Sequence, residues 1–188
     1  MISNAQKKYR AKRLANELSN AYDATLGVGR KELAKQYRRA AEEAKRQLGD
    51  MYDEIFASKM NDTLLMSDFY RYDRYYQLVE QLNKTLRSLG EKEVKITENK
   101  LVNMYIESGI MVNDSIGFVG NIDYSIEAIN AVKQIWCADG ELWSSRVWNN
   151  KAKMLDSIEK GLVDAVARGE NKDKIVKGLV EEFDVGFN

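Results

Sequence analysis

The absence of proline from all 188 residues constrains the fold more than any motif in the sequence. Average usage of about 5% would give roughly nine prolines in a chain of this length. Because proline breaks helix interiors, a chain without it is typical of long helices with short connections. The sequence therefore predicts an all-α fold.

Apolar residues recur at spacings of three and four, which is the pattern of one buried helix face. The pattern is most regular between residues 65 and 90, where it includes Leu82, Leu86 and Leu89. It predicts an elongated bundle of about six to seven helices. The turn-rich stretch near 113–121 leaves room for one short β-hairpin. We expect helices over residues 4–25, 31–56, 65–90, 97–110, 123–136, 144–168 and from 171 towards the C-terminus.

Glycines and polar caps set the expected helix ends. Gly27 and Gly29 predict a break after the first helix, and Gly90 predicts the end of the third, followed by an extended connector over 91–96. The expected N-caps are Ser125 (or Asp123), Ser144 and Asn171. The expected core positions include Tyr76, Trp148, Ala152, Leu155, Ile158, Leu162, Ile175, Leu179 and Phe183.

Charge is balanced over the whole chain but not along it. Lys plus Arg and Asp plus Glu number 29 each, whereas residues 1–50 hold 12 basic and six acidic side chains. We divide the chain near Glu91 into two regions. Residues 1–90 form an N-terminal helical region with a basic first helix, and residues 91–188 form a C-terminal helical region with a tryptophan-rich corner.

Catalytic chemistry has little support in this sequence. Histidine, the most frequent metal ligand and general base near neutral pH, is absent. The single cysteine, Cys137, has no histidine to activate it and no second cysteine for a disulfide or a zinc site. No glycine-rich phosphate loop is present. We therefore expect no enzymatic activity, no metal and no cofactor, and we find neither a membrane-spanning run nor a secretory signal.

The first helix carries a run of five cations without an acid among them: Lys7, Lys8, Arg10, Lys12 and Arg13. One interpretation is a helix face that is simply solvated. The other is an arm that contacts the phosphates of double-stranded DNA without reading its sequence, through release of counterions.

All three tryptophans, Trp136, Trp143 and Trp148, fall within 13 residues. Clustered indoles mark either a structural corner or a contact surface. Trp143 can act as a hydrophobic staple before Ser144 or contact a partner. Arg146 can stack on an indole or reach a partner's carboxylate. Trp143 and Arg146 are the candidate partner-binding residues.

Two stretches of the sequence resemble one protein family. The first is the pattern Trp-x-x-x-Gly-x-x-Trp-Ser-x-Arg-Val-Trp-x-Asn from Trp136, followed by Gly161-Leu162 and Gly169-Glu170-Asn171. The second is the aromatic run from Asp68 to Tyr76, followed by Leu86-Arg87-Ser88-Leu89-Gly90. Together they resemble the minor capsid proteins of tailed bacteriophages, the Mu F-like head morphogenesis family, over most of residues 50–188.

The resemblance implies a non-enzymatic minor capsid protein inside the phage head. Such a protein associates with the portal protein and other capsid proteins near the portal vertex, passes through the host cytoplasm during assembly, and assists head assembly and DNA packaging or ejection. Members of the family usually continue into an Arg-Leu-x-x-Thr-Glu-like segment, which this sequence does not contain, so functions housed in that segment are not carried over to it. The alternative is a cytosolic helical adaptor that binds another protein through the aromatic corner, without a virion or DNA.

Overall fold

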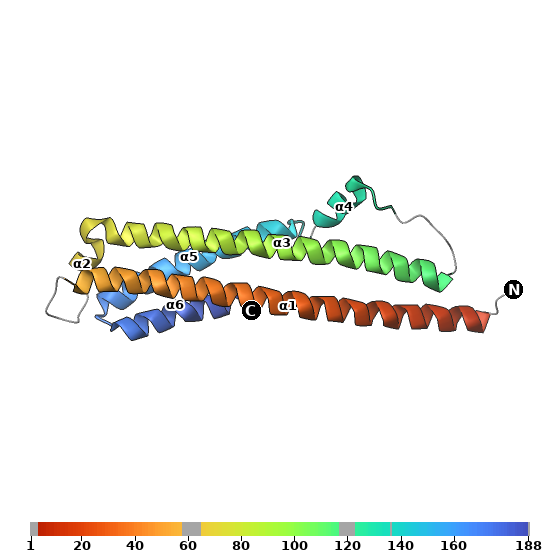
Figure 1. Ribbon diagram of the computed structural model, residues 1–188, viewed down its shortest axis with the longest axis horizontal. Helices are drawn as coiled ribbons and strands as arrows, with labels where there is room; N and C mark the ends of the chain where they lie inside the picture. Colours follow the sequence, from red (N-terminus) through yellow and green to blue (C-terminus); the bar gives the residue numbers. More distant parts are fainter. Residues whose placement is uncertain (1–3, 58–64, 117–122, 136, 188) are drawn as a thin grey trace. The chain divides into compact units, whose positions relative to one another are not determined.

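The computed structural model describes residues 4–57, 65–116, 123–135 and 137–187 (Figure 1). Within these ranges the regular secondary structure is helical and no sheet is present, so the predicted all-α class is confirmed. The elements are α1 (Asn4–Phe56), α2 (Met66–Tyr70), the 3-10 helix η1 (Arg71–Asp73), α3 (Arg74–Ile116), α4 (Ile126–Lys133), α5 (Trp143–Ala167) and α6 (Lys172–Phe187).

Helix α1 runs without a break through Gly27, Gly29 and Gly49, so the predicted division after residue 25 is wrong. Glycine in a helix interior costs only about 0.5–1 kcal/mol relative to alanine. That cost is small beside the hydrogen bonds that each further turn adds, and the helix continues for 53 residues.

Helix α3 likewise continues through Gly90 and through the predicted connector at 91–96, so both of those predictions are wrong. Gly90 serves close packing rather than helix termination. A Cβ atom at this position would lie 2.6 Å from Cζ3 of Trp148, which is closer than real carbon contacts allow. The helix predicted over residues 65–90 is instead interrupted near its start, at η1, where Asp73 has a φ of 57° in the left-handed region.

The predicted hairpin near 113–121 is not seen. Residues 113–116 form the last turn of α3, and 117–122 lie outside the described residues. Ser125 caps α4, because its Oγ accepts a hydrogen bond from the backbone N–H of Ala128 at 3.2 Å. Asn171 caps α6 in the same way, with Oδ1 accepting from the N–H of Lys174 at 3.0 Å. Both of these caps are confirmed.

The chain forms two compact units, each made of two separate segments. Unit 1 comprises residues 1–32 and 94–143, and unit 2 comprises residues 33–93 and 144–188. Helices α1 and α3 therefore each contribute to both units. The division near residue 91 was drawn along the sequence rather than by contacts, and it stays a prediction.

Unit 2 contains the hydrophobic core. Its buried cluster draws on α1, α2, α3, α5 and α6. The predicted burial of Leu82, Leu86 and Leu89 is confirmed, as is that of the apolar positions of α6. The core comprises Tyr37, Ala40, Ala41, Ala44, Leu48, Met51, Tyr52, Ile55, Phe69, Leu78, Leu82, Leu86, Leu89, Met154, Ile158, Leu162, Ala165, Val166, Ile175, Leu179 and Phe183.

The buried face of α5 begins one residue earlier than predicted. Val147, Lys151 and Met154 point inward, whereas Trp148 is 40% exposed and is not a core residue. The apolar pattern misled here because a lysine occupies an inward position. Ser144 is also not the cap, since α5 already includes Trp143.

The aromatic run at the start of α3 also differs in part from the prediction. Tyr76, expected in the core, is exposed. Tyr75 is half-buried, and its ring packs against Phe69 with a centroid distance of 5.1 Å. Its hydroxyl donates a hydrogen bond to Glu159 of α5 at 3.3 Å. The run therefore joins α2 and α3 to α5 inside unit 2.

Unit 1 has far less buried apolar surface. Ile96 and Met104 of α3 are the buried hydrophobic residues among its described residues, and α4 buries none. Gly29 of α1 packs against the side chain of Lys100, whose ammonium lies 3.6 Å from the carboxylate of Glu32. These contacts hold the two long helices together within unit 1.

Candidate functional site

The basic run at the start of α1 lies on a helix whose side chains face solvent. Lys8, Arg10, Lys12 and Arg13 are exposed, and Lys7 has a helical backbone. Because successive helical residues are rotated by about 100°, these cations surround the helix instead of forming one stripe. Arg13 forms an ion pair with Glu17 at 3.0 Å. The other three exposed cations form no ion pair with a described residue.

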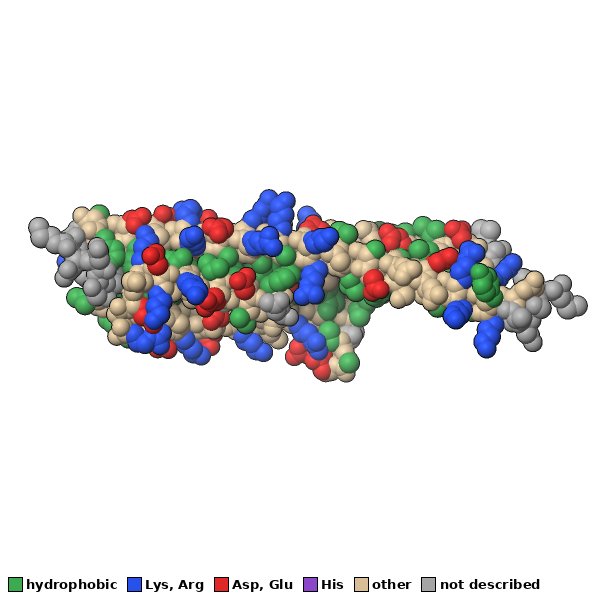
Figure 2. Space-filling model, turned by 90° about the horizontal axis from the view of Figure 1, so that it is seen from below, with side chains coloured by type: hydrophobic (Ala, Val, Ile, Leu, Met, Phe, Trp, Pro, Cys, Tyr) green, Lys and Arg blue, Asp and Glu red, His purple; other side chains and the backbone are tan. Residues whose placement is uncertain are grey.

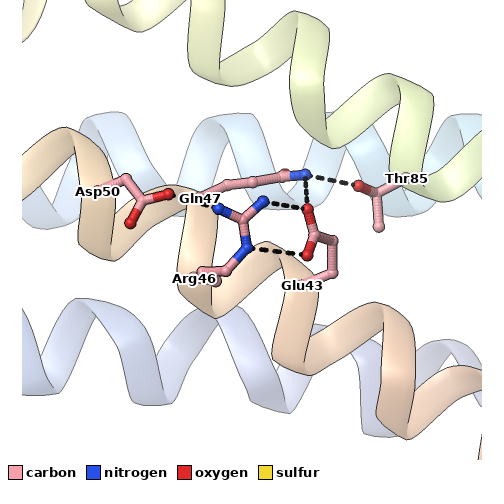
Figure 3. A network of polar contacts seen from close by, with 5 residues as sticks. All are labelled: Glu43, Arg46, Gln47, Asp50 and Thr85. Atoms are coloured by element: carbon pink, nitrogen blue, oxygen red, sulfur yellow. Dashed lines mark hydrogen bonds and ion pairs between the residues drawn. The ribbon is translucent and has the colours of Figure 1, made fainter.

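Charge elsewhere on the surface is mixed. On the face drawn in Figure 2, basic and acidic side chains are interspersed, as the equal totals of 29 lead one to expect. One such group lies on α1 in unit 2, where Arg46 contacts Glu43 and Asp50, each at 2.6 Å (Figure 3). Hydrogen bonding from Arg46 is the main cause that lowers the pKa of the Glu43 carboxyl. Because these side chains already form ion pairs with one another, they have little unpaired charge with which to bind a ligand.

The same group in Figure 3 links α1 to α3. The amide nitrogen of buried Gln47 donates to Glu43 at 2.9 Å and to the hydroxyl of Thr85 at 3.0 Å. Its amide oxygen has no hydrogen-bond partner among the described residues. That oxygen is itself buried, so it is closed to a ligand from solvent. The group is a helix–helix contact.

A buried charged cluster in unit 2 was missed by the sequence analysis. The Lys151 ammonium lies 2.7 Å from the Glu93 carboxylate, and only 5% of the lysine side chain is exposed. The Tyr37 hydroxyl donates to Glu93 at 2.9 Å and accepts a hydrogen bond from Lys151. Burial, with a smaller contribution from Glu93, raises the pKa of Tyr37 well above its ordinary value.

This cluster joins α1, α3 and α5 through one ion pair. The Lys151 side chain is buried, and its nitrogen is already in contact with the Glu93 carboxylate and the Tyr37 hydroxyl. The cluster therefore fits a structural role, fixing the register of three helices. The only signal in the sequence was the lysine that interrupts the apolar pattern of α5.

Trp143, a candidate partner-binding residue, is half-buried in unit 1. Its indole N–H donates to the backbone carbonyl of Lys133 at 2.8 Å. This bond ties the first residue of α5 to the last residue of α4, which is the role of a structural corner. Arg146 is exposed one turn later. Trp136, the third tryptophan, lies outside the described residues.

Trp148 borders a groove in unit 2 of about 420 Å³, which is also lined by Asn83, Leu86, Arg87, Lys151, Ala152 and Leu155. The indole packs on Gly90 while part of the ring stays exposed. The groove thus has an apolar floor and an exposed aromatic edge.

Cys137 is half-buried, and its backbone makes hydrogen bonds with Glu141 and Gly140 in a tight turn. In the part of the chain that the structure describes, no three His, Cys, Asp or Glu side chains gather as metal ligands would. No helix in that part combines the length and apolar character of a membrane span.

Comparison with known protein families, curated proteins and solved structures found no match for this chain.

Proposed function

We propose that this chain is a non-enzymatic head morphogenesis protein of a tailed bacteriophage. It acts inside the capsid near the portal vertex, with the portal protein and other capsid proteins as partners. It contacts double-stranded DNA without sequence preference through Lys7, Lys8, Arg10, Lys12 and Arg13. Its virion location follows from the sequence resemblance.

The observation that carries the proposal is the exposed basic start of α1. Three of its cations, Lys8, Arg10 and Lys12, have no ion-pair partner among the described residues, so they can neutralise phosphates without first breaking a protein contact. Because the cations surround the helix, they suit backbone contact rather than the ordered readout of base edges.

The DNA proposal is tested by replacing all five cations with glutamine. Binding to unrelated duplexes should weaken alike, and the slope of log affinity against log salt should fall by about 0.9 for each phosphate that the variant no longer neutralises. The control replaces five exposed cations of unit 2 with glutamine, namely Lys84, Arg87, Lys153, Lys160 and Lys177. If the control loses as much affinity as the N-terminal variant, or neither variant loses any, the assignment to α1 is wrong.

The head proposal is tested by purifying capsids and asking whether the protein co-purifies with them. The groove beside Trp148 favours one alternative, a cytosolic adaptor that binds a protein through the aromatic corner. An adaptor would be absent from capsids and would lose its partner on Trp148→Ala. A head protein should remain capsid-bound at low and moderate salt.

A further inference from the structure

Unit 1 leaves large apolar side chains exposed that its own helices do not cover. On the first half of α1, four such side chains are at least half exposed: Tyr9, Tyr22, Leu26 and Val28. The other segment of unit 1 adds Ile110, Val112, Tyr124, Ile126 and Ile135. Scattered exposed apolar residues are normal, but a concentration of them on a unit with so little core marks a contact surface.

Three of these exposed residues of α1 widen its inward face, whereas Tyr9 lies on the opposite side of the helix. Leu14, Leu18 and Gly29 lie on the covered side of the helix and are half-buried or buried. Tyr22 and Leu26 lie along one edge of that side, and Val28 lies along the other, by the helical period of 3.6 residues. One neighbouring helix covers only the middle of so wide an apolar stripe. Such a stripe fits a bundle that contains further helices.

The two segments of unit 1 also carry opposite charge. Residues 1–32 hold seven basic and three acidic side chains, and residues 94–143 hold three basic and seven acidic side chains. We call the described residues of these ranges the basic segment and the acidic segment. The totals of the two segments are the reverse of each other, so a surface made of both segments carries the opposite charges that self-association can pair.

Much of this charge is not neutralised within one chain. Lys8, Arg10 and Lys12 form no ion pair with another described residue, and the same holds for the exposed acids Glu107, Asp114 and Glu127. Lys100 and Glu32 form an ion pair that joins the two segments. Free charge of both signs therefore lies on the unit that also exposes apolar side chains.

We propose that unit 1 is a self-association surface. The basic segment of one copy packs against the acidic segment of a second copy, and the exposed apolar side chains of both become buried. DNA can contact only the basic segment of this surface, because phosphates are repelled by the acidic segment and cover no apolar side chains. A second copy contacts both segments and covers the apolar side chains. The inference stands apart from the proposed function, since it needs neither a virion nor DNA.

The first experiment is sedimentation equilibrium of the full chain without DNA, at low and at high salt. The wild-type protein should associate, and salt should weaken the association because the complementary charges are exposed. Replacing Tyr22, Leu26 and Val28 with serine should weaken association without changing the helix content measured by circular dichroism. A wild-type protein that stays monomeric at every concentration would overturn the proposal.

The second experiment exchanges the charges. One variant carries Lys8→Glu, Arg10→Glu and Lys12→Glu, and the other carries Glu107→Lys, Asp114→Lys and Glu127→Lys. Each alone should associate at least about tenfold more weakly than the wild-type protein, because like charges now meet. An equimolar mixture should regain association, since the reversed acidic segment of one faces the reversed basic segment of the other.

The matched control reverses three exposed cations of unit 2, with Lys153→Glu, Lys160→Glu and Lys177→Glu. This control should associate like the wild-type protein. If it weakens association as strongly as the N-terminal variant, or if the mixture of reversed variants stays dissociated, a second copy is not the occupant. Loss of DNA binding by the basic-reversed variant, with no self-association in the wild-type protein, would instead assign the basic segment to DNA alone.

Discussion

Unit 1 and unit 2 share two continuous helices yet differ in how those helices are stabilised. In unit 2, α1 and α3 pack with α2, α5 and α6 around a buried cluster of apolar side chains. In unit 1, the same two helices bury Ile96 and Met104 among the described residues, and they leave apolar side chains exposed. Helix continuity therefore extends well beyond the region where packing stabilises the chain.

The comparison shows that one part of a helix can be packed in a core while another part of the same helix stays exposed to solvent and to partners. Most helical stability in proteins comes from tertiary packing of an apolar face. The part of α1 in unit 2 has that packing, whereas the part in unit 1 leaves Tyr22, Leu26 and Val28 beside its covered face, and its charged side chains, exposed to solvent. The basic run lies in unit 1, whereas the buried ion pair that links three helices lies in unit 2.

The largest effect is expected at the buried ion pair of unit 2. Glu93→Leu removes the carboxylate that lies 2.7 Å from the Lys151 ammonium and leaves that charge buried. We expect a loss of about 3–5 kcal/mol in the free energy of unfolding, measured by urea denaturation. Glu91→Leu on the same helix is the control, because Glu91 is exposed and its ion pair with Arg87 should contribute less than about 1 kcal/mol. Equal losses would mean that the buried pair does not stabilise the fold.

Leucine truncation compares the two units directly. Leu86→Ala in the core of unit 2 should cost about 2–5 kcal/mol, through reduced burial and a cavity. Leu26→Ala in unit 1 should change the stability of the dilute protein by less than about 0.5 kcal/mol, because this side chain is 55% exposed. Similar losses from the two substitutions would show that unit 1 has a core of its own.

Glycine substitutions separate close packing from helix propensity. Gly90→Ala should destabilise unit 2 by about 1–3 kcal/mol, because its Cβ would overlap the Trp148 ring. Gly49→Ala meets no atom within 4 Å and should stabilise the protein by about 0.5–1 kcal/mol. Adding Trp148→Ala to Gly90→Ala should remove most of the overlap. If Gly90→Ala alone is stabilising, the glycine is not needed for the contact.

The sequence predicted the fold class and much of the core, because spacings of three and four residues report directly on a buried helix face. It failed at Gly27 and Gly90, where a local propensity of about 1 kcal/mol was outweighed by continued helix and tertiary contacts. It also failed on α5, where Lys151 hid the true inward face. That lysine is inward only because Glu93 and Tyr37 come from distant parts of the chain, which no local pattern can show.

The candidate site was predictable only where its signal is local. The basic run could be read from consecutive residues, and its exposure on a helix matches one requirement of a contact surface. The groove beside Trp148 could not be read in this way, since it needs Asn83 and Arg87 of α3 beside a residue of α5. The opposite net charges of the two segments of unit 1 likewise become visible only once the residues that make up each unit are known.

The smallest effect concerns one hydroxyl in the core of unit 2. Tyr52 is buried, its hydroxyl has no partner among the described residues, and burial raises its pKa to about 12. The folded protein therefore retains this proton above the ordinary tyrosine pKa of about 10, and stability is lost as the pH rises from about 10 through 12. Tyr52→Phe should leave stability at pH 7 unchanged or raised by up to about 1 kcal/mol, and should reduce the loss of stability between about pH 10 and 12. An identical pH dependence in the two proteins would contradict the assignment.

Hydrogen exchange of the full chain, measured when dilute and when concentrated, tests most directly whether unit 2 is stabilised by its own core and unit 1 by a second copy. The helical amides of residues 33–56, 74–93 and 144–187 should exchange slowly at both concentrations, because their opening requires loss of the core. The helical amides of residues 4–32 and 94–116 should exchange quickly in the dilute protein and more slowly in the concentrated one. Equal and strong protection of both units in the dilute protein would contradict this account.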